Sequence, residues 1–131
     1  MMKKILIIDD EVGVCQLLQS FLKKDYEVMT ATGGQGAIEI FVRENPDAVI
    51  SDFNLGEPPY GDELLRIMKE KVPSITVVMM SGEREIGTKL LLEGADAFFE
   101  KPVDFSRLQK FLDQRFQPGT DKIHSIKTSV Q

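Results

Sequence analysis

The sequence predicts a doubly wound α/β fold, a five-stranded parallel sheet with helices on both faces. Short, continuous apolar runs, such as those at residues 5–8 and 77–80, are typical of strands buried on both faces. Each run is followed by a segment whose apolar residues recur at helical spacing. Strands that alternate with helices in this way require parallel strands joined by right-handed crossovers.

The first two units show the pattern clearly. The first strand is expected over residues 4–9, where the apolar run ends in acidic residues, and the first helix over residues 12–22. The second strand is expected at residues 26–31 and the second helix at residues 36–43. The Asn45-Pro46 pair then breaks the helix.

The remaining three units follow the same rule. The third strand and the third helix are separated by a loop over residues 54–61 that is rich in Pro and Gly. Gly94 and Ala95 end the fourth helix. The expected strands are residues 48–52, 75–80 and 97–99, and the expected helices are residues 62–71, 83–93 and 105–116.

One compact domain accounts for nearly the whole chain. The length of 131 residues, with 42% hydrophobic and 28% charged residues, fits a single globular domain. We expect this domain to span residues 1–117. The break at Gln117-Pro118-Gly119 and the mostly polar text beyond it indicate that residues 118–131 are a polar tail or the stub of a linker.

Charge and composition argue against several classes of function. The net charge of −5, without any cluster of Lys and Arg, argues against direct binding to nucleic acid. No apolar stretch is long enough to span a membrane, and the run at residues 5–8 is too short for a signal peptide. The lone Cys15 fits a reducing compartment. We therefore expect a cytoplasmic protein.

Four of the predicted strands end at polar residues suited to phosphate or a divalent cation. These are the pair Asp9-Asp10, then Asp52, Ser81 and Lys101. In an open parallel sheet the carboxyl ends of all strands meet at one edge, so these residues converge. In the flavodoxin-like order 2-1-3-4-5, the first and third strands are neighbours about 4.8 Å apart.

Three carboxylates in one pocket favour a bound cation. Taken singly, Asp9, Asp10 or Asp52 could be a helix cap or a turn residue. Together they crowd negative charge, which is costly without a cation, and Mg²⁺ prefers such oxygen ligands. Ser81 and Lys101, each explicable alone as a turn residue, add a hydroxyl donor and a positive charge that suit a phosphoryl group on a nearby carboxylate.

At this point the chain resembles the receiver domain of response regulators in bacterial two-component signalling, as found in stand-alone, chemotaxis-regulator-like proteins. The resemblance covers residues 3–116 and rests on four segments. They are Ile-Leu-Ile-Ile-Asp-Asp-Glu (5–11), Asp52, Met-Ser-Gly (80–82) and Gly-Ala-Asp-Ala-Phe-Phe-Glu-Lys-Pro (94–102).

The resemblance implies a phosphorylation site. Asp52 would accept a phosphoryl group from a histidine kinase or a phosphotransfer protein, which makes the chain a phosphoprotein of a phosphorelay. Asp10, Asp52 and the backbone carbonyl of Asn54 would ligate Mg²⁺, and Asp9 would act through a water. Ser81 and Lys101 would hold the phosphoryl oxygens.

The resemblance also implies a switch. The phosphoryl group adds roughly −1.5 to −2 charge, which would draw Ser81 and Lys101 inward. Phe98 matches the switch aromatic of the family and would rotate inward as the Ser81 hydroxyl moves. Asn54 and Glu83 occupy positions that modulate autodephosphorylation by controlling the access of water, and we expect a fairly short-lived phosphoryl state.

The chain departs from the family pattern in the loop after Asp52. Members of the family usually carry a proline four residues after the acceptor, where this chain has Gly56. The loop to Gly61 is one residue longer and contains Pro58 and Pro59. The shape of this loop is therefore left open by the sequence.

The sequence leaves two alternative functions open, and it does not identify the partner of the chain. The chain could be a receiver-like interaction module that works without phosphate. A haloacid-dehalogenase-like phosphatase is the weaker alternative, since it needs an acid where Asn54 stands and a cap domain. We expect no enzyme activity beyond self-catalysed phosphoryl acceptance and autodephosphorylation. Since no output domain follows the receiver in these 131 residues, we expect the signal to leave by contact with an unknown protein, or with a domain that the sequence does not include. Homodimerisation on phosphorylation, through the fourth and fifth helices and the fifth strand, is a further option.

Overall fold

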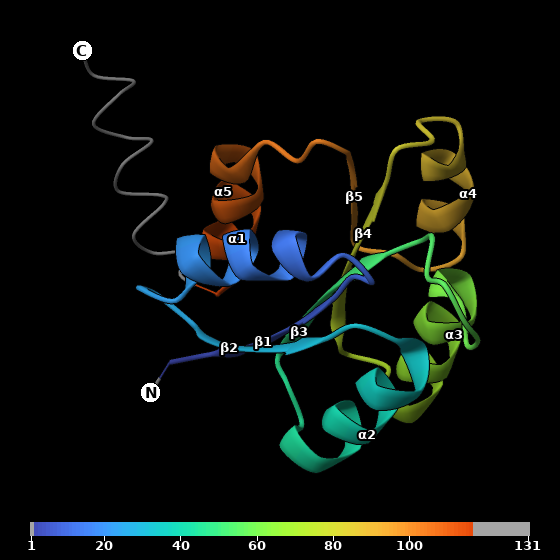
Figure 1. Ribbon diagram of the computed structural model, residues 1–131, viewed down its shortest axis with the longest axis horizontal. Coiled ribbons are helices and arrows are strands. Elements are labelled where there is room, and N and C mark those ends of the chain that lie inside the picture. The colour runs from blue at the N-terminus through green and yellow to red at the C-terminus, as the bar shows by residue number, and fades with distance from the viewer. Residues whose placement is uncertain (1, 117–131) are drawn as a thin grey trace.

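The computed structural model describes residues 2–116, which form alternating strands and helices (Figure 1). The strands are β1 (Lys4–Ile8), β2 (Glu27–Ala31), β3 (Ala48–Asp52), β4 (Thr76–Ser81) and β5 (Ala97–Glu100). The helices are α1 (Val12–Leu22), α2 (Gly34–Glu44), α3 (Gly61–Lys71), α4 (Ile86–Leu92) and α5 (Phe105–Phe116). The tail predicted for residues 118–131, and residue 117 with it, lie outside the described residues.

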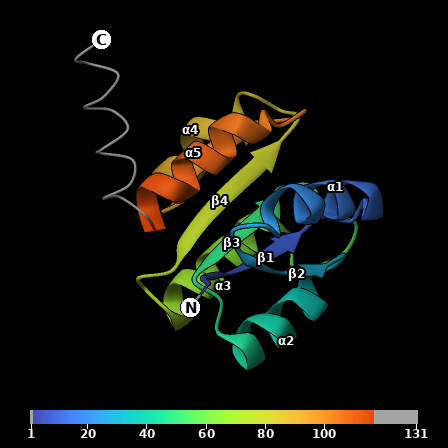
Figure 2. The same ribbon diagram turned by 90° about the vertical axis from the view of Figure 1, so that its left-hand side faces the viewer.

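The strands form one parallel sheet in the order β2-β1-β3-β4-β5, which confirms the predicted fold class and strand order. Every neighbouring pair is parallel, so the strand arrows point the same way (Figure 2). Their carboxyl ends therefore share one edge of the sheet, as the sequence predicted.

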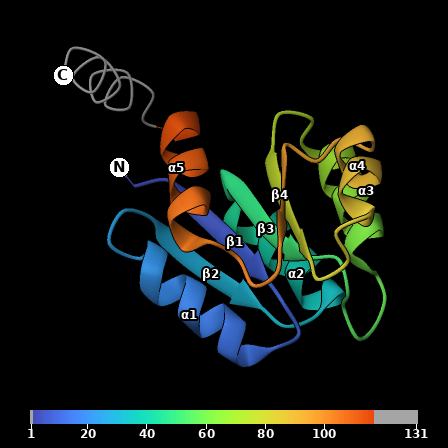
Figure 3. The same ribbon diagram turned by 90° about the horizontal axis from the view of Figure 1, so that it is seen from above.

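Helices cover both faces of the sheet. Figure 3 shows α1 and α5 on one face and α2, α3 and α4 on the other. The two sets of buried side chains agree with this arrangement. Residues of α1 and α5 pack with Ile5, Ile7, Ile50, Val78 and Met80. Residues of α2, α3 and α4 pack with Leu6, Ile8, Val49, Val77 and Met79.

This alternation explains the continuous apolar runs of the sequence. Successive residues of a strand point to opposite faces, so a strand between two helical layers needs apolar residues at every position. Burying this apolar surface is the main favourable contribution to folding.

Two helices begin two or more residues away from their predicted starts. We expected the fourth helix to begin at residue 83, but α4 begins at Ile86. The Ser81 Oγ accepts a hydrogen bond from the Glu83 N–H, and Ile86 N–H donates to the Glu83 carbonyl three residues earlier. This tight turn takes up residues 83–85 before the α-helix starts. The second helix begins at Gly34, two residues earlier than expected.

Within residues 2–116, none of the helices combines the length and the apolar character needed to cross a membrane.

Asp96 joins three elements at the edge of the sheet opposite to the acidic residues. It lies just before β5, and its side chain is 18% exposed. One carboxylate oxygen accepts hydrogen bonds from Lys69 Nζ at 2.9 Å and from the Val77 N–H at 2.8 Å, and the other accepts from Arg115 Nη2 at 3.0 Å. Asp96 thus ties α3, β4 and α5 to the start of β5.

These contacts lower the pKa of Asp96. Burial alone would raise the pKa, but the hydrogen bonds from Lys69 and the Val77 N–H outweigh it. Because the pKa is lower in the folded chain than in the unfolded chain, Asp96 stabilises the fold at pH values above the ordinary carboxyl pKa. This stabilisation is lost as the pH falls through the folded value.

We predict that Asp96→Ala lowers the free energy of unfolding by about 2 kcal/mol at neutral pH, because two cations and a backbone N–H lose their acceptor. The difference from the wild type should shrink as the pH falls below ~4. Urea unfolding followed by circular dichroism at several pH values measures both effects.

Glu70→Ala is the matched control for this prediction. Glu70 is an exposed acid of α3, and no hydrogen bond or ion pair of its side chain occurs among residues 2–116. It should leave the stability nearly unchanged at every pH. Equal stability of the Asp96 variant and the wild type at neutral pH would contradict the prediction.

Candidate functional site

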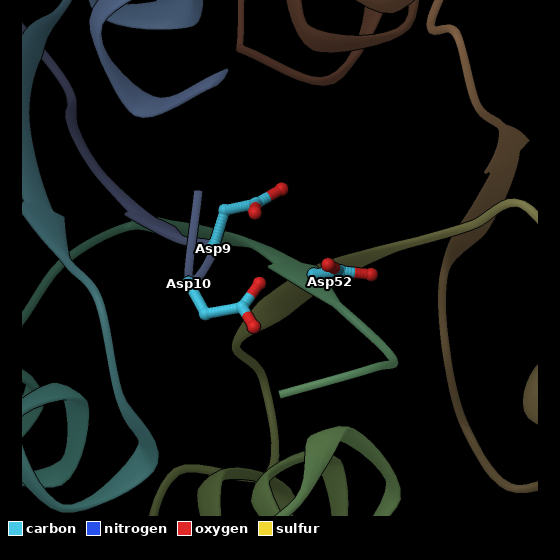
Figure 4. Close-up of side chains that lie close together, drawn as sticks. All are labelled: Asp9, Asp10 and Asp52. Atoms are coloured by element: carbon cyan, nitrogen blue, oxygen red, sulfur yellow. The ribbon is translucent and has the colours of Figure 1, made fainter. Parts of the chain in front are cut away.

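The three acids of the predicted site meet at the carboxyl edge of the sheet. Asp9 and Asp10 directly follow β1, and Asp52 is the last residue of β3. These strands are hydrogen-bonded neighbours, with Ile8 opposite Ser51. Each acid places a carboxylate oxygen within 4.8 Å of the other two (Figure 4). The convergence expected from the strand order is therefore present.

Ser81 and Lys101 reach the same edge from the other half of the sheet. Ser81 is the last residue of β4, and Lys101 follows β5. The Lys101 N–H donates to the Ser81 carbonyl at 2.9 Å, which continues the pairing of the two strands past the end of β5. The peptide bond between Lys101 and Pro102 is cis.

Lys101 bridges two of the acids. Its Nζ lies 2.8 Å from Asp9 Oδ2 and 3.1 Å from Asp52 Oδ2. Burial lowers the pKa of Lys101, but the hydrogen bonds to Asp9 and Asp52 raise it by a larger amount. The pKa of Lys101 is therefore above its ordinary value. The lysine therefore stays charged and offsets part of the repulsion between the carboxylates.

The acids differ strongly in their surroundings. Asp9 is fully buried, and its Oδ1 accepts the Glu11 N–H at 2.9 Å while Oδ2 meets Lys101. Both of its oxygens are thus engaged by the protein. Asp10 is exposed. The side chain of Asp10 is therefore the one most available to an ion arriving from solvent.

Asp52 is 4% exposed. Burial raises the pKa of Asp52 above its ordinary value. The hydrogen bonds from Lys101 and from the Asn54 N–H, which lies 3.2 Å from Oδ1, offset only part of this increase. An open pocket of about 440 Å³ leads to it. The pocket is lined by Asp10, Glu11, Asp52, Asn54, Gly82, Glu83 and Lys101. A nearly buried carboxylate thus lies at the base of an opening rimmed by charged and polar groups.

The Ser81 hydroxyl is held by groups from two loops. Its Oγ donates to Asn54 Oδ1 at 3.3 Å and accepts the Glu83 N–H at 3.0 Å. The sequence indicated Asn54, Ser81 and Glu83 as separate site residues but not these contacts between them. The hydroxyl therefore links the loop after Asp52 to the turn before α4.

Glu11 is the site residue that sequence reasoning missed. It lines the pocket, and its N–H holds the buried Asp9 carboxylate. The available signal was its place directly after Asp9-Asp10, where an acid also fits the start of a helix. In the sequence, Glu11 stands out only as the last residue of the segment 5–11 that carries the resemblance to the receiver family.

Phe98 does not line the pocket. It lies opposite Met79 in the sheet and packs against the core beneath α4, where it is half-buried. The predicted switch aromatic thus lies beneath the site, on the face covered by α4.

The loop after Asp52 forms one wall of the pocket. It passes close to the acids, since a Cβ atom at Gly56 would lie 3.6 Å from Asp10 Oδ2. The peptide bond between Pro58 and Pro59 is cis. The loop ends at Gly61, where a Cβ atom would lie 2.7 Å from the Asp52 carbonyl oxygen, so a larger residue would force the loop away from β3.

Comparison with known proteins agrees with this geometry. Residues 5–113 match the family described as the response regulator receiver domain. The chain is 34% identical over 112 residues to sporulation initiation phosphotransferase F of Bacillus subtilis. This match covers 83% of the chain and 90% of that protein. It is also 34% identical over 113 residues to the transcriptional regulatory protein ZraR of Klebsiella oxytoca, which covers 84% of this chain.

The chain spans about a quarter of the length of ZraR, since the match covers 25% of that protein. Among solved structures, the receiver domain of NtrX from Brucella abortus superposes with a TM-score of 0.79 and 32% sequence identity. That match covers 84% of this chain and 95% of the solved chain. With its acidic edge, its lysine and its strand order, the protein belongs to the family of response regulator receiver domains.

Proposed function

We propose that the chain is a Mg²⁺-dependent signalling switch in which Asp52 accepts a phosphoryl group from a histidine kinase or a phosphotransfer protein. The observation that carries the proposal is the placement of Asp52, which lies between the exposed Asp10 and the Lys101 ammonium at the base of an open pocket. Membership of the receiver family supports the same conclusion.

The donor set of the site fits Mg²⁺. Three carboxylates offer oxygens within 4.8 Å of one another, and hard oxygen ligands are those that Mg²⁺ prefers. Asp10 and Asp52 would hold the ion with the backbone carbonyl of Asn54. Asp9 would act through a water, since both of its oxygens already have partners in the chain. The ion would neutralise charge on the phosphoryl group as it transfers.

The proposed reaction is a simple displacement at phosphorus. A carboxylate oxygen of Asp52 forms the new O–P bond as the P–N bond of a donor phosphohistidine breaks. The electron pair of that bond stays on the leaving imidazole, which takes up a proton. The product on this chain is an acyl phosphate, and the Lys101 ammonium and the Ser81 hydroxyl would hold its oxygens.

The contacts of Lys101 and Ser81 suggest how phosphorylation would be transmitted. The phosphoryl group adds roughly −1.5 to −2 charge at neutral pH, so Lys101 would exchange carboxylate partners for phosphoryl oxygens. Ser81 would exchange its partner Asn54 in the same way. Movement of Ser81 would also weaken its hydrogen bond to the Glu83 N–H and alter the turn that precedes α4.

Output by protein contact completes the proposal. The expected receiver of the signal is a downstream protein or a second copy of the chain that recognises α4, β5 and α5, in the cytoplasm and without direct contact with nucleic acid. Beyond accepting and hydrolysing its own phosphoryl group, the chain would catalyse no reaction.

The first prediction concerns the acceptor. Incubation with acetyl phosphate and Mg²⁺ should add one phosphoryl group to the wild type and none to Asp52→Asn, because the amide is not a nucleophile. Intact-mass spectrometry measures the product. Glu70→Gln, which removes an exposed charge at the far end of α3, is the matched control and should be modified like the wild type.

Modification of Asp52→Asn to the wild-type extent would sink the proposed acceptor. If no phosphorylation occurs, and beryllofluoride with Mg²⁺ leaves the amide NMR spectrum of the wild type unchanged, the chain is instead an interaction module that works without phosphate.

The second prediction concerns Lys101. In Lys101→Met the positive charge that competes for Asp9 and Asp52 is gone, so Mg²⁺ should bind about three- to tenfold more tightly. Beryllofluoride should bind more weakly, because its anionic fluorides lose their cation. Isothermal titration calorimetry measures both affinities, and unchanged Mg²⁺ affinity would contradict the proposed competition.

The third prediction concerns the lifetime of the acyl phosphate. Asn54 and Glu83 line the open pocket, which supports access of water to the phosphoryl group. We expect hydrolysis within minutes in the presence of Mg²⁺, measured by the decay of the phosphorylated mass after removal of acetyl phosphate. A half-life of many hours would refute this expectation.

A further inference from the structure

The ring of Phe98 lies directly on the backbone of α4 at Gly87. A Cβ atom at Gly87 would lie 2.7 Å from Cδ2 of Phe98, 3.0 Å from Cε2 and 3.2 Å from Cγ. Carbon atoms that are not bonded come into optimal contact at about 3.5–4.0 Å, so a side chain at position 87 would displace the ring. Gly87 is buried, and the ring occupies the space that its side chain would need.

The position of Phe98 also connects it to Ser81. Phe98 lies opposite Met79 in the parallel pair of β4 and β5, and both residues belong to the core beneath α4. Ser81 is two residues after Met79 on the same strand, so its side chain points to the same face of the sheet. The ring and the hydroxyl therefore share one layer, between the sheet and α4.

Gly87 is itself joined to the Ser81 hydroxyl through the turn before α4. Ser81 Oγ accepts the Glu83 N–H, the Glu83 carbonyl accepts the Ile86 N–H, and the Arg84 carbonyl accepts the Gly87 N–H. Since α4 begins at Ile86, Gly87 lies in its first turn. A movement of Ser81 would thus change both the position of the α4 backbone that contacts the Phe98 ring and the space beside the ring.

We infer that Gly87 is a positioning residue for the switch. Because Gly87 has no side chain, the Phe98 ring can pack against the backbone of α4 in the arrangement where the Ser81 hydroxyl is hydrogen-bonded to Asn54 and Glu83. The inference rests on the proposed function, because it concerns the regulation of the same site. A side chain at position 87 destabilises this arrangement and shifts the population toward the one in which Ser81 and Lys101 hold the phosphoryl group.

The displaced ring has space to move into. Phe98 lies in β5, the strand at the edge of the sheet, and its side chain is only half-buried. The layer that it shares with Ser81 would open if the hydroxyl moved to the phosphoryl group. A half-buried ring on an edge strand can change position without disrupting the main core. The contact with Gly87 therefore affects which position the ring takes more than whether the chain folds.

The test is the affinity of Gly87→Ala for beryllofluoride at saturating Mg²⁺, followed by amide NMR. The apparent dissociation constant should fall about threefold or more, because a larger fraction of the variant already has the binding-competent arrangement. Two controls separate this effect from a gain in helix propensity. Gly36→Ala makes the same change in α2 at a position with open space, and Thr88→Ala improves propensity on the exposed side of α4. Both should bind like the wild type.

A double-mutant cycle identifies the ring as the cause. In the Phe98→Leu background, where the ring is absent, Gly87→Ala should leave the affinity for beryllofluoride unchanged. An unchanged or weaker affinity of the single Gly87→Ala variant, or an equal gain with and without the ring, would overturn the inference.

A measurement on the wild type makes the inference independent of the folding of any variant. Nuclear Overhauser effects between the Gly87 Hα protons and the Phe98 ring protons should be present in the free protein and lost with beryllofluoride. Their persistence in the complex would also overturn the inference. A wild type that gives no response to beryllofluoride at all would instead refute the proposed function, and the role of Gly87 with it.

Discussion

The ion pairs of Lys101 with Asp9 and Asp52 are the interaction on which the arrangement of this edge depends. Asp9 is completely buried and Asp52 nearly so, and a buried carboxylate without a partner is strongly destabilising. The lysine that offsets their charge follows β5, an edge strand that is separated from β1 by β3 and β4. The pocket therefore exists only if all of β1, β3, β4 and β5 keep their order and register.

The same ion pairs make the site sensitive to its occupant. In the proposed function, a divalent cation would compete with the ammonium for the carboxylates, and a phosphoryl group would compete with the carboxylates for the ammonium. Ser81 is in a similar position, since it is bonded both to the loop after Asp52 and to the turn before α4. Each side chain that would bind the phosphoryl group must first give up a contact that holds another part of the structure, and this exchange can move a signal away from the pocket.

Much of the fold and of the site could be predicted from the sequence, because both depend on simple periodic rules. Apolar runs with helical segments between them are enough to indicate a parallel sheet, and in such a sheet Asp9, Asp52 and Lys101 must end at one edge. The chemistry expected of three acids and a lysine then follows from their charges, without any knowledge of side-chain conformations.

What the sequence could not provide are contacts that depend on side-chain geometry. The start of α4 was predicted three residues too early, because helical periodicity does not reveal that Ser81 Oγ bonds the Glu83 N–H. By propensity, Gly87 only weakens a helix. Its contact with the Phe98 ring becomes evident only once β5 and α4 are placed side by side. Glu11 was overlooked for the same reason, since an acid at the start of a helix has an ordinary explanation.

A crystal structure of the protein with Mg²⁺ and beryllofluoride tests the central claim most directly. The account predicts beryllium bonded to an Asp52 oxygen, Mg²⁺ on Asp10, Asp52 and the Asn54 carbonyl, and the Lys101 ammonium moved from the carboxylates to a fluoride. Beryllofluoride bound away from Asp52, or a complex in which Lys101 still bridges Asp9 and Asp52, would contradict it.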